Sequence, residues 1–210
     1  MCYNTDLQEN SMISKEQYDA DNRKINLALE FANRKHSAVV NKDGTMGQRR
    51  KGSRLPYIIH PLEVWMILRN NNCSADVQVA GLLHDTLEDT GATPDEIEKL
   101  FGREVRELVV TESEDKSKSW KERKQHTIDS MAGASLETMQ VCCADKLANC
   151  RSQAYDFRLI GDRLFERFNR EATPELQSWY YHGVVKALKP LEGMKMYDEL
   201  KEVVRQVYGE

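Results

Sequence analysis

The spacing of hydrophobic residues along this chain predicts a protein built mainly of amphipathic helices. In the segment 15–35, apolar residues recur at intervals of three and four, which places them on one face of a helix. These residues are Ile25, Ala28, Leu29 and Ala32. Residues 1–15 show no such periodicity. We therefore expect a polar, poorly ordered N-terminal segment before a single domain that spans residues 16–210.

Signals for the starts of helices divide the next part of the chain. We expect His60, which precedes Pro61, to have a non-helical backbone, with Pro61 in the first position of a helix that continues to about Asn70. Ser74 can cap the following helix, which we expect to end near Gly91. The first of these helices has apolar residues on most of its surface and is predicted to lie mostly in the core, and the second is predicted to bury one face.

Capping patterns and aromatic residues predict further helices towards the C-terminus. Thr93, Pro94 and Glu96 have the spacing of a capping box, and a second short helix should follow Gly102. The highly charged segment 112–125 is typical of a surface loop that leads into a helix. Residues 136–151 and the aromatic-rich last sixty residues predict helices that close a bundle. The expected fold class is all-α.

Composition and charge narrow the classes of function. The 210 residues are 40% hydrophobic and 30% charged, and the net charge of −4 excludes a generally basic nucleic-acid-binding protein while allowing a local basic pocket. The five cysteines form no CxxC pair, which favours reduced thiols in the cytoplasm. No apolar stretch approaches about 18 residues and no signal peptide is evident. We expect a cytoplasmic protein whose partners are neither membranes nor nucleic-acid polymers.

The segment GLLHDTLEDT offers the clearest candidate chemistry. An apolar run ends at His84 and Asp85, and Glu88 and Asp89 would each lie one helical turn beyond them. Buried charge is costly unless it is paired or bound to a cation, so a divalent metal held by His84 and Asp85 explains the pattern. The alternative is a core histidine beside a solvated acidic helix end.

A second segment repeats this arrangement. A small apolar stretch delivers Asp145 where burial is expected, and Asn149 lies one turn later. Together, His60, His84, Asp85 and Asp145 offer two imidazoles and two carboxylates, a donor set that suits Mn²⁺, Fe²⁺, Zn²⁺ or Mg²⁺. A metal of this kind polarises a phosphoryl oxygen and lowers the pKa of its water, which indicates phosphoester hydrolysis.

The segment RRKGSR at residues 49–54 carries four cations in six positions. It is either a solvated basic loop or a glycine-containing clamp for a phosphate or a flat ring.

With RRKGSRLPYIIHPLEV, GLLHDTLEDT, FGREV, EDKSKSWKERK and ADKLANCR in the same order and spacing, residues 20–185 resemble the (p)ppGpp hydrolase domain of RelA/SpoT proteins. The H…HD…D pattern is that of HD-domain phosphohydrolases, and the chain is most similar to the small alarmone hydrolases, which include the metazoan SpoT homologues. The resemblance implies an all-helical HD domain that binds one divalent metal, Mn²⁺, and removes pyrophosphate from the 3′ position of ppGpp or pppGpp.

The resemblance also implies roles for individual residues. The metal ligands would be His60, His84, Asp85 and Asp145. Glu88 and Asp89 would orient or deprotonate the attacking water. The nucleotide would be contacted by Arg50, Lys51, Asn149, Lys116 and Arg167. Two departures from the family are a longer loop between His36 and Gln48, which leaves the role of His36 open, and Ala148 where relatives carry histidine or an aromatic residue.

Two alternative functions remain open from the sequence. The same metal site could act on another phosphorylated nucleotide, such as a nucleoside monophosphate or a 2′-phosphorylated dinucleotide, with release of inorganic phosphate only. The domain could also be a nucleotide-sensing module without catalysis, although Glu88 and Asp89 disfavour it, because a binding protein has little need for two extra carboxylates beside a hydrated metal.

Overall fold

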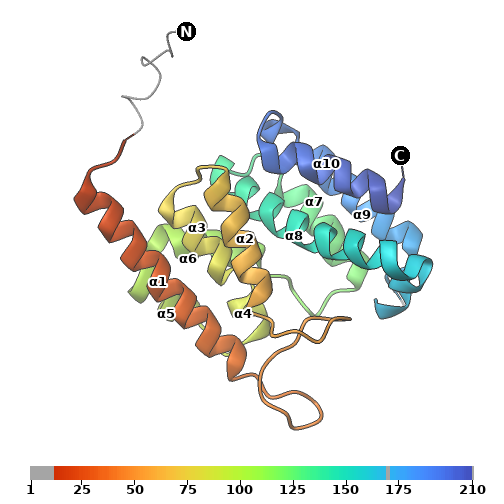
Figure 1. Ribbon diagram of the computed structural model, residues 1–210, viewed down its shortest axis with the longest axis horizontal. Coiled ribbons are helices and arrows are strands. Elements are labelled where there is room, and N and C mark those ends of the chain that lie inside the picture. Colours follow the sequence, from red (N-terminus) through yellow and green to blue (C-terminus); the bar gives the residue numbers. More distant parts are fainter. Residues whose placement is uncertain (1–11, 169–170, 210) are drawn as a thin grey trace.

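A computed structural model of the chain describes residues 12–168 and 171–209. In these residues the chain forms helices and two isolated β-bridges but no extended strand, which confirms the all-α prediction (Figure 1). The predictions for the N-terminal segment up to position 11, and for Cys2, lie outside the described residues. The helices are α1 Lys15–Ser37, α2 Ile59–Asn70, α3 Ala75–Leu83, α4 Thr86–Asp89, α5 Pro94–Phe101, α6 Arg103–Glu112, α7 Trp120–Ser130, α8 Leu136–Ile160, η2 Gly161–Arg167, α9 Pro174–Ala187, η3 Lys189–Leu191 and α10 Lys195–Tyr208.

Helix α3 forms the centre of the core and packs against α1, α2, α6 and α8. Its residues from Val79 to Leu83 are fully or almost fully buried. Gly81 allows α2 to approach closely, because a Cβ atom at this position would lie 2.4 Å from Cδ1 of Leu68 and 3.1 Å from Cγ1 of Val64. This close packing sets the distance between the end of α3 and the start of α2.

Several helix starts agree with the capping patterns in the sequence. The Ser74 side chain accepts a hydrogen bond from the Val77 amide at the start of α3. Thr93 and Glu96 form both bonds of the predicted capping box at α5. The end of α3 differs from the prediction, because the helix expected to continue to Gly91 stops at Leu83 and the short α4 follows it.

Local hydrogen bonding explains the interruption after α3. The Thr86 hydroxyl donates to the carbonyl oxygen of Leu83 at 2.7 Å, so a side chain takes an acceptor that a continuing helix would use. Asp85 has φ −91° and ψ −4°, which lies in the bridge region between helical and extended backbone. The polypeptide therefore turns at the two residues that carry the His-Asp pair.

The start of α2 also corrects a prediction. His60 lies inside the first turn of α2 and its amide donates to the Tyr57 carbonyl at 2.9 Å, so the expected non-helical backbone at His60 is wrong. The amides of a first helical turn have no partner within the helix, so Pro61 costs no hydrogen bond there. The constraint that a proline places on the preceding residue is outweighed by helix formation.

The C-terminal helices close the bundle, as the aromatic-rich pattern predicted: α10 and η2 pack on α8, and α9 packs on α7 and α10. Helix α10 lies along α8 and α9, and the Thr173 side chain caps α9 (Figure 1). The thiols of Cys73, Cys142, Cys143 and Cys150 are unpaired, as the absence of a CxxC pair predicted, and they lie buried in the core. No helix within residues 12–168 and 171–209 has the length and apolar character needed to cross a membrane.

Candidate active site

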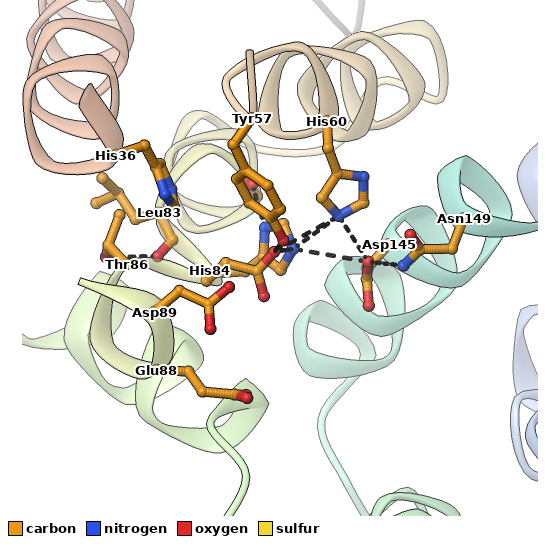
Figure 2. Close-up of polar contacts among 12 residues, drawn as sticks. His36, Tyr57, His60, Leu83, His84, Thr86, Glu88, Asp89, Asp145 and Asn149 are labelled. Atoms are coloured by element: carbon orange, nitrogen blue, oxygen red, sulfur yellow. Dashed lines mark hydrogen bonds and ion pairs between the residues drawn. The ribbon is translucent and has the colours of Figure 1, made fainter. Parts of the chain in front are cut away.

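Three helices bring two histidines and two aspartates together at one end of the core (Figure 2). His60 comes from the first turn of α2, His84 and Asp85 from the turn after α3, and Asp145 from the middle of α8. The His60 Nε2 atom lies 3.2 Å from His84 Nε2 and 3.0 Å from Asp145 Oδ1. The His84 Nε2 atom lies 2.9 Å from Asp85 Oδ2 and 3.6 Å from Asp145 Oδ1.

The orientation of the rings suits a bound cation. His84 Nδ1 lies 2.8 Å from the Gly81 carbonyl oxygen, so it donates a proton there and leaves the Nε2 lone pair facing His60. Two imidazole lone pairs at 3.2 Å repel each other unless a proton or a cation lies between them. Donor atoms of His60, His84 and Asp145 lie within 4.8 Å of one another, and Asp85 adds a further carboxylate. This donor set fits one divalent metal ion.

The electrostatics of the cluster favour positive charge at its centre. Burial raises the pKa of Asp85 and Asp145, but neighbouring positive groups outweigh this effect and hold both carboxyls below their ordinary pKa. Burial lowers the pKa of His60, whereas the two carboxylates overcome burial and raise the pKa of His84. The two aspartates therefore stay ionised, and their negative charge needs a cationic partner.

Neighbouring polar groups fix the two carboxylates. The Tyr57 hydroxyl donates a short hydrogen bond to Asp85 Oδ2. Asn149, one turn after Asp145 on α8, donates from Nδ2 to Asp145 Oδ1 at 2.6 Å (Figure 2). Lys146 forms a buried ion pair with the other oxygen of Asp145. These bonds restrict the rotation of each carboxylate and direct it towards the histidines.

The two further acids lie on α4 beside the cluster (Figure 2). Burial raises the pKa of the Glu88 carboxyl, which favours proton uptake. Asp89 accepts from Gln48 Nε2 at 2.8 Å and pairs with Lys116 Nζ at 3.1 Å. His36 is not one of the residues whose donor atoms gather at the candidate metal site, and its Nδ1 lies 2.6 Å from Gln48 Oε1. The structure thus links His36 to Asp89 through Gln48.

A cavity of about 690 Å³ opens over these residues and is lined by both acids and bases. The Arg50 guanidinium donates to Asn149 Oδ1 at 3.0 Å and lies over the Tyr57 ring. Lys51 and Arg167 also line the cavity, and Arg167 forms an ion pair with Asp156. All five residues that the family resemblance implied as nucleotide contacts line this cavity: Arg50, Lys51, Lys116, Asn149 and Arg167.

The charged segment 112–125 forms the predicted loop that leads into α7, and several of its charged side chains also line the cavity. Glu114 pairs with Arg123 Nη1 at 2.9 Å and with Lys124 Nζ at 2.6 Å, and its side chain is 14% exposed. Burial raises the pKa of Glu112 to about 7. The tertiary structure turns these charges inward, where opposite signs compensate one another.

Sequence reasoning missed several residues of the site. Tyr57 had a weak signal, since it precedes His60 within the PYIIH motif. Lys146 also had one, because a cation directly follows the buried Asp145. Nothing in the local sequence indicated that Gln48 contacts Asp89, since the two lie 41 positions apart.

Comparisons with known proteins agree with this geometry. The model of the HD domain family matches residues 28–154. The guanosine-3′,5′-bis(diphosphate) 3′-pyrophosphohydrolase MESH1 of Mus musculus is 33% identical over 194 residues, 87% of this chain and 92% of the mouse protein. The Homo sapiens MESH1 protein is 41% identical over 128 residues, 59% of this chain and 66% of the human protein. A solved structure described as a metazoan orthologue of SpoT that hydrolyses ppGpp superposes with a TM-score of 0.69 and 31% identity, over 89% of this chain and 97% of that one.

Proposed function

The chain belongs to the HD domain family, within the group of the MESH1 pyrophosphohydrolases, and we propose that it hydrolyses ppGpp or pppGpp to GDP or GTP and pyrophosphate. The observation that carries this proposal is the approach of His60 Nε2 and His84 Nε2 to 3.2 Å beside two ionised aspartates. The cavity over that point has several arginines and lysines in its lining, which a substrate with two diphosphate groups requires.

We propose that His60, His84, Asp85 and Asp145 hold one divalent ion, and that this ion is Mn²⁺. Mixed imidazole and carboxylate donors suit Mn²⁺, which accepts both nitrogen and oxygen ligands. When bound, the ion polarises a phosphoryl oxygen and lowers the pKa of water. The hydrogen bonds from Tyr57 and Asn149 hold the two aspartates in the orientation that the ion needs.

The remaining residues supply proton transfer and binding. Water attacks the phosphorus attached to the ribose 3′ oxygen, the bond between phosphorus and that oxygen breaks, and pyrophosphate is released. Glu88 or Asp89 accepts the proton of the attacking water, and the 3′ oxygen takes up a proton as it leaves. Arg50 and Lys51 would bind the nucleotide through charge and stacking, Lys116 a phosphate, and Asn149 the ribose.

Product analysis tests this function. We expect purified, manganese-loaded protein to convert ppGpp to GDP and pyrophosphate, and the Asp85→Ala variant to bind less metal and to lose turnover. Release of inorganic phosphate alone, or turnover of other phosphorylated nucleotides but not ppGpp, would instead support the second enzymatic function. Nucleotide binding without turnover in the wild-type protein would support a sensing module.

Metal identity is tested separately from activity. We expect the apoprotein to bind one equivalent of Mn²⁺ in calorimetry, and added Mn²⁺ to raise the thermal midpoint because the ion binds only the folded state. The same titration with Mg²⁺, Fe²⁺ and Zn²⁺ ranks the alternatives. A cytoplasmic location also remains part of this proposal, since buried free thiols suit a reducing compartment.

A further inference from the structure

The guanidinium group of Arg167 lies directly against the backbone of Gly52. A Cβ atom at position 52 would lie 2.4 Å from Arg167 Nη1, 2.8 Å from Cζ and 3.1 Å from Cδ. Gly52 also has φ +86°, which residues with a side chain rarely adopt. The backbone conformation therefore favours glycine at this position, and the lack of a side chain leaves room for the guanidinium.

An ion pair holds Arg167 from the other side. Arg167 Nη1 is paired with Asp156 Oδ2, and the two side chains are 27% and 19% exposed. Asp156 belongs to the last turns of α8, and Arg167 ends the 3-10 helix η2 that follows. The guanidinium thus joins the C-terminal part of α8 to a loop more than 100 positions earlier in the chain; in Figure 1 that loop reaches from the end of α1 across the lower part of the molecule.

The loop seated in this way is the basic loop, residues 49–54. It carries Arg50, which bonds Asn149 at 3.0 Å, and Lys51, whose ammonium has no hydrogen bond or ion pair to any residue within 12–168 or 171–209. Backbone bonds define the turn itself: Arg50 N donates to the Leu55 carbonyl at 2.9 Å, Arg54 N to the Arg50 carbonyl at 3.1 Å and Ser53 N to the Lys51 carbonyl at 3.2 Å, and a bridge between Arg49 and Pro56 closes its base. None of these backbone bonds reaches α8 or η2, so the position of the loop against them depends on side-chain contacts.

We propose that Arg167, held by Asp156, is a positioning residue that seats the basic loop at the mouth of the cavity and so prepares Arg50 and Lys51 to bind phosphate. Its effect on substrate binding rests on the proposed function, whereas its effect on the loop does not. The guanidinium is planar, so it can lie flat on the Gly52 backbone and bond a carboxylate in the same plane. A lysine ammonium carries the same charge and cannot make this contact.

The competing role for Arg167 is a direct phosphate ligand. The two roles predict different results for Arg167→Lys, because a charge that binds phosphate survives this substitution and a flat contact on Gly52 does not. Asp156→Asn is a second substitution for which the two roles predict different results. If Arg167 binds phosphate directly, loss of the Asp156 charge leaves the guanidinium more available to the substrate. If Arg167 positions the loop, the same loss weakens the support of the loop.

The basic loop provides its own reporter, since trypsin cleaves after Arg49, Arg50, Lys51 and Arg54. Cleavage follows the population of the open loop when opening is fast. We expect Arg167→Ala, Arg167→Lys and Asp156→Asn to raise the cleavage rate at these bonds about tenfold, the factor expected from loss of one charge-assisted contact. Arg163→Ala, which changes an exposed arginine in the same 3-10 helix, should leave the rate unchanged. Thermal midpoints close to wild type will show that the variants remain folded.

Steady-state kinetics complete the test. With ppGpp, the same three variants should raise KM about tenfold and leave kcat within about twofold of wild type, since the loop binds substrate and takes no part in bond cleavage. An unchanged cleavage rate in Arg167→Ala, or a raised rate with unchanged KM, overturns the positioning role. Normal KM in Arg167→Lys identifies a direct phosphate ligand. If the wild-type protein hydrolyses no ppGpp, the proposed function fails, while the cleavage rates still decide whether Arg167 seats the loop.

Discussion

Substitution of Tyr57 by phenylalanine tests whether the bond to Asp85 organises the metal site. The change deletes one oxygen atom and keeps the ring, so the contact with His36 and the position of Arg50 over the ring are retained. The lost interaction is the hydrogen bond from the hydroxyl to Asp85 Oδ2. Asp85 would then be free to rotate away from His84.

The expected loss follows from the charge on Asp85. A hydrogen bond to an ionised group contributes about 1.5–3 kcal/mol, and each 1.4 kcal/mol changes an equilibrium about tenfold. Metal affinity should therefore fall by a factor of about 10 to 100, which is also the usual effect of removing a group that orients a metal ligand. Activity at saturating metal should stay close to wild type, because no group that binds substrate is removed.

Calorimetric titration of the apoprotein with Mn²⁺ measures this effect, and the dependence of ppGpp hydrolysis on metal concentration provides a second measurement. Tyr155→Phe is the matched control, because it removes the hydroxyl of a tyrosine that is 58% exposed on α8. Equal metal affinities in Tyr57→Phe and Tyr155→Phe would refute the assigned role of this hydrogen bond, whether or not both differ from wild type.

Three further substitutions give separate expectations. Gly81→Ala should lower the free energy of unfolding by about 1–3 kcal/mol, since the new Cβ would lie 2.4 Å from Leu68. Gly91→Ala is the control, because a Cβ atom there has open space and should leave stability nearly unchanged. Equal thermal midpoints of the two variants would contradict this expectation. Asp89→Asn should lower kcat by a factor of about 10² to 10⁴ with metal binding retained, and an unaffected kcat would remove Asp89 from proton transfer. Glu112 has its pKa raised by burial from 4.5 to about 7, so the native state binds more protons than the unfolded state between these values and its stability falls as pH rises through them. Glu112→Gln should reduce the difference in thermal midpoint between pH 5 and pH 8, and an unchanged difference would show that Glu112 ionises normally.

Local signals in the sequence predicted several helix starts in which one short segment supplies both partners of an interaction. The capping box of Thr93 and Glu96 and the cap at Ser74 form within three residues, and each appears in the structure as predicted. Apolar periodicity also predicted α1 correctly, because the pattern depends only on residues three and four positions apart. The His60–Pro61 pair was misjudged, because a rule for isolated dipeptides ignored the free amides of a first helical turn.

In the candidate site, too, local features could be predicted from the sequence and long-range contacts could not. The sequence indicated which side chains carry the chemistry, since a histidine and aspartates after apolar runs are expected to be buried. It could not indicate that His36 supports Asp89 through Gln48, or that Glu114 pairs with Lys124 inside the cavity wall. A run of charges has the same sequence pattern whether it faces water or an oppositely charged neighbour.

The sequence by itself determined the helical class of this protein, the caps that start several helices, and the residue types that can hold a metal ion, because each depends on neighbours within about one turn. Only the tertiary structure decided that α2, α3 and α8 meet with two imidazole nitrogens 3.2 Å apart, and that the basic loop rests on Arg167. The physical reason is distance along the chain. Packing at Gly81 and the contact at Gly52 join segments whose separation leaves no periodic or local trace in the order of residues.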